Sequence, residues 1–157
     1  MDQPNVSYAG FWKRFVAYII DDIVLSVAGF VVILFVGALF GLSFLSMFSG
    51  DMESTVALIV AAASAILMAI LAVMIVGWLY YALMEASTSQ ATLGKMALGI
   101  KVTDLEGNRI TFGRASGRYF GKIVSGMILY IGFVMTGFTD KKQALHDIMA
   151  SCLVVNK

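Results

Sequence analysis

Two long stretches without charge constrain this chain more than any other feature. No charged residue occurs in residues 23–50, and none occurs in residues 54–84. A helix needs about 20 mostly apolar residues to cross a bilayer. Both stretches exceed that length, and only a short acidic connection separates them. The sequence therefore predicts an all-α membrane protein with two spans, helix one at about 12–45 and helix two at about 55–85.

The composition fits a single membrane domain covering residues 1–157. Sixty per cent of the residues are hydrophobic and 13% are charged, whereas soluble domains carry roughly 25% charged residues. The net charge of +1 indicates no nucleic-acid partner. The lone histidine, His146, cannot assemble a zinc cluster, and no serine–histidine–carboxylate arrangement is indicated. We therefore expect no enzyme, no metal and no cofactor.

A small polar region of about residues 92–122 follows helix two. Alternating apolar residues at Ile100/Val102 and Ile110/Phe112, around a Gly-Asn pair, predict a β-hairpin. Three basic residues four apart then predict one face of a basic amphipathic helix, namely Arg114, Arg118 and Lys122. Such a helix typically lies on anionic lipid, and the alternative is a plain solvated face.

The third apolar segment, residues 123–139, is short and interrupted by glycines. It suits either a membrane crossing or a re-entrant segment. The tail, residues 140–157, contains a strand candidate at Leu153–Val155, which can pair with the strand at Ile100 only from the same side. We therefore expect the third segment to dip in without crossing, so that both termini lie on one side.

The distribution of basic residues predicts the orientation. Residues 86–122 carry six lysines and arginines, whereas the connection after helix one carries none. By the positive-inside rule, the N-terminus and the polar region are cytoplasmic, and Asp51 and Glu53 are outside. The expected location is a cell membrane of the bacterial inner-membrane type.

Small residues recur at helical spacing within both predicted spans. Helix one has a GxxxG spacing at Gly37 and Gly41, and helix two has alanines four apart, at Ala57, Ala61, Ala65 and Ala69. Small residues on one face let helices approach closely in lipid. We expect these positions to mediate close helix contact, including contact in a homo-oligomer.

Several short motifs occur in order along nearly the whole chain. They are FWKRFVAYIID at residues 11–21, ATLGK at 91–95, GIKVTD at 99–104, FGRA at 112–115 and KQALHD at 142–147. Together they resemble the RDD family of small integral membrane proteins. The family is named for one arginine and two aspartates, and by position these resemble Arg14, Asp21 and Asp147. Asp22 stays open as an alternative for the second aspartate. The resemblance implies transport of an unspecified ligand, with cation/proton antiport in some relatives.

Arg14 and Asp21 lie on one helix face about 10 Å apart along the axis, too far for direct pairing. Asp147 and His146 are the candidate partners that the resemblance indicates. On a structural interpretation, the charges form a network that docks the tail. On a functional interpretation, Asp21 or Asp22 binds a monovalent cation or relays a proton. The further ligands would come from other segments, as Gln143, Ser87 or a backbone carbonyl.

Two functions from different classes follow. The first is a small ion or solute transporter of the cation/proton antiport type that uses carboxylates at the membrane interface. The alternative is a non-transporting membrane module that binds anionic lipids or partner proteins through its basic cytoplasmic face. Carboxylates facing a wet cavity would favour the first, and a closed salt-bridge network would favour the second.

Overall fold

A computed structural model describes residues 7–46, 52–127 and 131–157 of the chain. Its two longest elements are α1 (Phe11–Ser46) and α2 (Met52–Ala86). Both are long and apolar enough to cross a membrane, over Phe11–Leu39 in α1 and Thr55–Ala86 in α2. The two predicted helices are thus confirmed, each extending slightly further than the sequence pattern indicated.

The chain divides into two compact units. The first, here called the span unit, comprises Val24–Gly77 and contains most of α1 and α2. The second, here called the head unit, comprises Met1–Ile23 together with Trp78–Lys157. Each helix therefore starts or ends in the head unit and passes into the span unit.

In the span unit, side chains of α1 and α2 are exposed except along one face of each helix. The four alanines of the predicted stripe all lie at partly covered positions of α2, while the residues that directly follow each of them, at positions 58, 62, 66 and 70, are mostly exposed. On α1, a Cβ added at Gly29 would lie 3.7 Å from Val73 of α2, so these helices approach each other closely there. Gly37 has open space around it, and the surroundings of Gly41 lie outside the described residues, as does Asp51. An oligomer stays a prediction.

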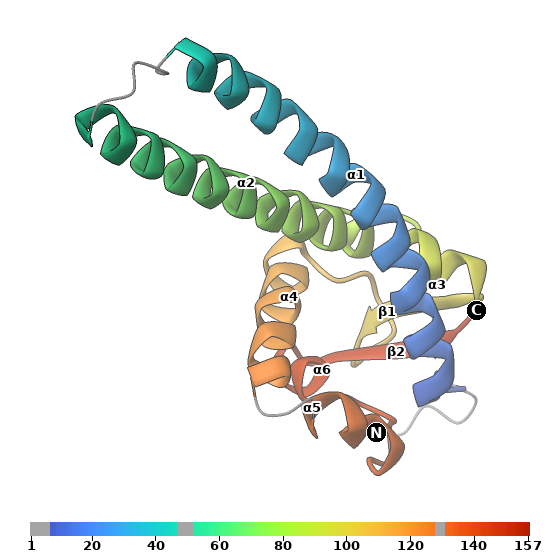
Figure 1. Cartoon of the computed structure of the whole chain (residues 1–157). Helices are drawn as coiled ribbons and strands as arrows, with labels where there is room; N and C mark the ends of the chain where they lie inside the picture. The colour runs from blue at the N-terminus through green and yellow to red at the C-terminus, as the bar shows by residue number, and fades with distance from the viewer. Residues whose placement is uncertain (1–6, 47–51, 128–130) are drawn as a thin grey trace. The chain divides into compact units, whose positions relative to one another are not determined.

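The head unit contains a two-stranded antiparallel sheet with short helices (Figure 1). The strands are β1 (Ile100–Asp104) and β2 (Cys152–Asn156), with Val102 opposite Val154. The helices are α3 (Leu93–Ala97), α4 (Phe112–Met127), α5 (Ile131–Val134), η1 (Met135–Gly137) and α6 (Leu145–Met149). Figure 1 shows α4, α5 and α6 close together beside β2, and α4 packs on both α5 and α6.

The predicted hairpin is wrong in its second strand. After the β1 strand, the carboxylate of Asp104 accepts hydrogen bonds from the backbone N–H groups of Glu106 and Asn108, and Gly107 adopts a φ of +88°. This turn leads directly into α4, whose Arg114 N–H donates to the Thr111 hydroxyl. The strand that pairs with β1 instead comes from the far end of the chain, as the expected pairing of the tail required.

Both ends of the chain meet in the head unit. The backbone N–H of Ala9 donates to the carbonyl of Val154 over 2.9 Å, and Asn156 N–H donates to Ser7 over 2.9 Å. Residues 7–9 thus run beside the edge of β2 that β1 leaves free. That both ends of the chain lie on one side of the membrane stays a prediction.

The third apolar segment contains no helix of spanning length among the residues that the structure describes. It divides into the end of α4, the four-residue helix α5 and the 3-10 turn η1. Whether it enters the membrane stays a prediction. A small apolar core fills the head unit around Ile100, Val102, Ile110 and Val154, against which Trp78 packs.

Candidate functional site

Asp147 joins α1, α4 and α6 through buried ion pairs. It is fully buried, and its two oxygens take different cations. Oδ2 pairs with Arg14 of α1, and Oδ1 accepts from Nε of Arg118 of α4 over 2.7 Å. The backbone N–H of Ala144 also donates to Oδ2 over 3.1 Å. Arg14 in turn donates through Nε to the carbonyl of Ala9 over 2.9 Å, which anchors the start of α1.

Glu85, at the end of α2, is the second buried carboxylate, with 1% of its surface exposed. Its Oε1 lies 2.5 Å from Nζ of Lys95, 2.6 Å from an Nη of Arg118 and 3.8 Å from Nζ of Lys122. The Arg118 contact has ion-pair distance, but its angle does not make it a hydrogen bond. The guanidinium of Arg118 therefore bridges Asp147 and Glu85. We call the residues joined by these ion pairs the charge network: Arg14, Glu85, Lys95, Arg118, Lys122 and Asp147.

The charge network contains four cationic side chains and two carboxylates. Burial and this charge imbalance shift the pKa values of its members. Burial lowers the pKa of Lys122 to about 7, because the attraction of Glu85 is opposed by repulsion from Lys95 and Arg118. Burial also lowers the pKa of Lys95. Burial alone would raise the pKa of Asp147, but Arg118 and Arg14 outweigh it and hold that pKa well below its usual range. Asp147 is consequently ionised at any physiological pH, while the charge of Lys122 titrates near neutrality.

Asp21 lies in a separate polar site. One oxygen accepts from the Tyr80 hydroxyl and from the Gly94 N–H, both over 2.8 Å, and the other accepts from Thr92 over 2.6 Å. A Cβ added at Gly94 would lie 2.1 Å from the carbonyl oxygen of Ala17, so only glycine allows this close approach of α3 to α1. Asp21 thereby attaches α3 to α1, with both of its oxygens occupied by protein donors.

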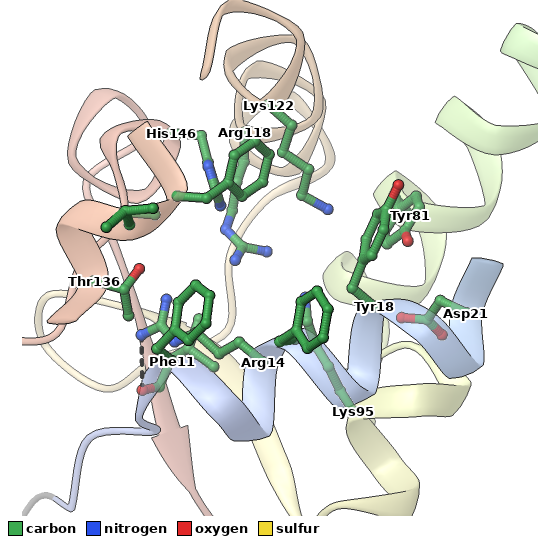
Figure 2. Close-up of a pocket in the computed structure, with 15 residues that line it drawn as sticks. Phe11, Arg14, Tyr18, Asp21, Tyr81, Lys95, Arg118, Lys122, Thr136 and His146 are labelled. Atoms are coloured by element: carbon green, nitrogen blue, oxygen red, sulfur yellow. Dashed lines mark hydrogen bonds between the residues drawn. The ribbon is translucent and has the colours of Figure 1, made fainter. Parts of the chain in front are cut away.

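A cavity of about 330 Å³ opens between these groups. Figure 2 shows the side chains of Arg118 and Lys122 extending into it from one side, with Arg14 and Phe11 on the other and Tyr81 and Asp21 at one end. Its walls are mostly apolar, and the lining residues include Phe11, Phe15, Tyr18, Phe133, Val134 and Val154. The cavity thus combines four cationic side chains, from Arg14, Lys95, Arg118 and Lys122, with aromatic walls.

The structure places the predicted site residues unevenly. It brings Arg14 and Asp147 into direct contact and puts Asp21 on the same cavity with different partners. His146 lines the cavity, its ring 5.1 Å from that of Phe133, and burial lowers its pKa to about 3, so it is neutral. Asp22 is exposed.

Gln143 does not line the cavity. Its side-chain N–H donates to the carbonyl of Cys152 over 2.9 Å, and its backbone N–H donates to the Thr139 hydroxyl over 2.7 Å. Gln143 thus fastens the turn before α6 to the β2 strand, which is a role in the fold of the head unit.

The basic row on α4 does not form one outer face. Arg118 is 2% exposed and lies in the charge network, and Nζ of Lys122 lies 3.7 Å from the centre of the Tyr81 ring. Arg114 alone of the three is exposed, 3.9 Å from Asp104. The prediction that all three residues face lipid is therefore wrong. Arg118 and Lys122 turn toward the buried carboxylates of α2 and α6, and only Arg114 stays on the surface.

Sequence reasoning did not single out Glu85 or Lys95, although both belong to the charge network. The signal was the position of Glu85 directly after a long uncharged stretch, where a carboxylate needs a cation. The partners come from α3 and α4 and could not be assigned from spacing. Among the described residues, no three histidine, cysteine or carboxylate side chains lie together as metal ligands would.

Known proteins are similar to this chain over nearly its whole length. A family model described as the RDD family matches residues 8–151. The chain is 40% identical to the uncharacterized protein YxaI of Bacillus subtilis (strain 168) over 157 residues, which covers all of both chains. It is 31% identical to the uncharacterized membrane protein YteJ of the same organism, over 96% of this chain and 82% of the relative. No solved structure matches this chain.

Proposed function

The chain belongs to the RDD family of membrane proteins, and from this premise we propose that it is a non-catalytic membrane module that binds a small anionic group. One observation carries the proposal: the cavity of the head unit is lined by four cations, whereas the two carboxylates of the charge network point at protein donors. Of these cations, Lys122 is the least closely paired with a carboxylate, 3.8 Å from Glu85, and it lines the cavity. We place the head unit on the cytoplasmic side, in keeping with its basic residues.

The carboxylates do not offer what a cation site needs. Hard cations bind to several oxygens that are free to face them. The oxygens of Asp147 and the Oε1 of Glu85 lie against arginine, lysine or backbone N–H groups, and both oxygens of Asp21 accept from Tyr80, Thr92 and Gly94. A cation entering here would have to displace these donors, and it would meet the lysine and arginine side chains that line the cavity.

The sign of the ligand charge tests this function. The full-length protein in a neutral detergent is titrated with dodecyl phosphate and with dodecyltrimethylammonium, two amphiphiles of equal chain and opposite charge. A ligand that binds the folded state but not the unfolded chain raises the unfolding temperature, and the rise grows with the ligand concentration relative to its Kd. We expect dodecyl phosphate alone to raise it. Equal shifts for both amphiphiles, or a shift for the cation only, would refute anion binding.

Cation/proton exchange is the second candidate, and two observations favour it. Asp21 lines the cavity, and the pKa of Lys122 is about 7, so one group near the site exchanges its proton at physiological pH. Reconstituted protein would then couple monovalent cation flux to pH in liposomes. Asp21→Asn should abolish coupling without unfolding the protein, while the neighbouring exposed Asp22→Asn serves as control. Absence of coupling in the wild-type protein rejects exchange.

A further inference from the structure

The apolar walls of the cavity indicate that its ligand has an apolar part as well as a negative charge. The cationic groups contribute only a small part of its surface, and most of the lining is aromatic or aliphatic. A small hydrated anion would lose its water in such a space and contact little beyond the cations. An anion attached to an apolar body would bury that body against the aromatic walls and place its charge at the cations.

The rim of the cavity continues onto the outer face of α1. Phe15 and Tyr18 line the cavity and yet are 44% and 51% exposed. Both belong to the first turns of the candidate span, and Trp12 beside them is 73% exposed. A chain lying along this aromatic face can therefore enter the cavity from the side on which α1 meets lipid.

We propose that the cavity binds an anionic lipid of the bilayer, with its phosphate or carboxylate at Lys122 and Arg118 and part of its chain against Phe11, Phe15 and Tyr18. This inference rests on the proposed anion-binding function and narrows it to one ligand class. The volume of about 330 Å³ is at the lower end of small-molecule pockets, which start near ~300 Å³. The cavity therefore holds a head and the beginning of a chain, and the remaining chain stays in the membrane.

Lys122 is the group that can respond to the ligand. Its Nζ lies 3.8 Å from Glu85, farther than either other cation on that oxygen, and it lines the cavity. The groups that face it are Tyr81 and Glu85 of α2, Lys95 of α3, Arg118 of α4, and His146 and Asp147 of α6. Replacing Lys122 leaves Glu85 paired with Lys95 and Arg118, so Lys122→Gln should fold.

The first experiment compares dodecyl phosphate with inorganic phosphate and ethyl phosphate on the full-length protein in neutral detergent. We expect dodecyl phosphate to bind at least tenfold more tightly than either short anion. Comparable binding of inorganic phosphate would overturn the lipid inference and leave the anion-binding function standing. Failure of all three anions to bind would overturn both.

Two pairs of variants test the placement of head and chain. Lys122→Gln should weaken dodecyl phosphate binding roughly tenfold or more, the usual size for a lost charge-assisted contact. Its control is Arg109→Gln, which removes an exposed cation outside the cavity. Phe15→Ala should weaken dodecyl phosphate but not ethyl phosphate, with Phe30→Ala, an exposed residue farther along α1, as control. Unchanged binding in both test variants would overturn the inference.

The last experiment distinguishes a ligand from the bilayer from a soluble amphiphile. The protein is placed in nanodiscs of phosphatidylcholine with a minor fraction of phosphatidic acid, and bound lipid is measured by native mass spectrometry after release. Wild-type protein should retain phosphatidic acid, and Lys122→Gln should retain less. If dodecyl phosphate binds and phosphatidic acid is not retained, the ligand is a soluble amphiphile and the lipid assignment fails.

Discussion

The span unit and the head unit differ in which polar groups they bury. The span unit buries backbone groups within apolar helices, whereas the head unit also buries charged side chains. Residues 24–77 contain no lysine or arginine, and all eleven of these cations belong to the head unit. In the span unit, helices satisfy the backbone internally, and apolar side chains face outward where lipid replaces water. In the head unit, charged side chains are themselves buried, and each needs a specific partner from a distant segment. Substitutions should therefore be tolerated very differently in the two units.

The largest expected effect is at Arg118, which bridges both buried carboxylates. Arg118→Met leaves Asp147 and Glu85 buried with fewer cations, and breaking a buried pair in this way costs roughly 3–5 kcal/mol. We expect the head unit to lose its resistance to protease while the helical circular dichroism of α1 and α2 persists. The matched control is Arg114→Met on the same helix, whose exposed pair should change stability by less than about 0.5 kcal/mol. Equal effects of the two variants would mean that the charge network does not stabilise the head unit.

A smaller effect is expected from pH, through His146. Its folded-state pKa is about 3, against about 6.5 in an unfolded chain. Between these values the unfolded chain binds a proton that the folded protein does not, so stability falls as the pH drops below 6.5. The slope approaches about 1.4 kcal/mol per pH unit. Asp147 shares the sign, but its contribution is lost only below about pH 4, the ordinary range of a carboxyl.

The measurement is the unfolding midpoint of the full-length protein in neutral detergent between about pH 7 and about pH 5, over the window named above. The wild-type midpoint should fall with acidification, and His146→Gln, which carries no titrating ring, should flatten that fall. A variant with the same pH dependence as the wild type would show that another group causes the acid sensitivity.

The smallest expected effect is in the span unit. Ala61 lies on the partly covered face of α2, and Ala62 beside it is exposed. Ala61→Leu should cost about 1 kcal/mol, because the added carbons crowd a close helix contact, while Ala62→Leu should be nearly neutral. Thermal unfolding compares the two variants, and cross-linking shows whether either changes self-association. If Ala62→Leu proves the more damaging, the exposed face of α2 contacts another copy of the chain.

The candidate site shows where prediction from sequence ends. Arg14, Asp21 and Asp147 were singled out from motifs that resemble a family, and the structure has Arg14 against Asp147. It also gives Asp21 a different set of partners, from α2 and from residues 92–94. The sequence predicts Lys122 at a lipid surface, whereas in the structure it lines a cavity. In each case the sequence indicates that the residue matters, but it does not indicate which residues contact it in the folded protein.

The sequence by itself determined the two spanning helices, because helix formation in lipid depends only on a local run of apolar residues that satisfies its own backbone. It also indicated the charged positions that require an explanation. Only the tertiary structure decided that β1 pairs with the end of the chain, that Arg118 and Lys122 turn inward, and that Glu85 lies between three cations. These outcomes depend on contacts between residues far apart in sequence, whose energies include burial and mutual charge. The spacing of residues along α4 shows that one face of this helix is basic. Whether that face is buried or exposed depends on Glu85 and Asp147, which come from other segments.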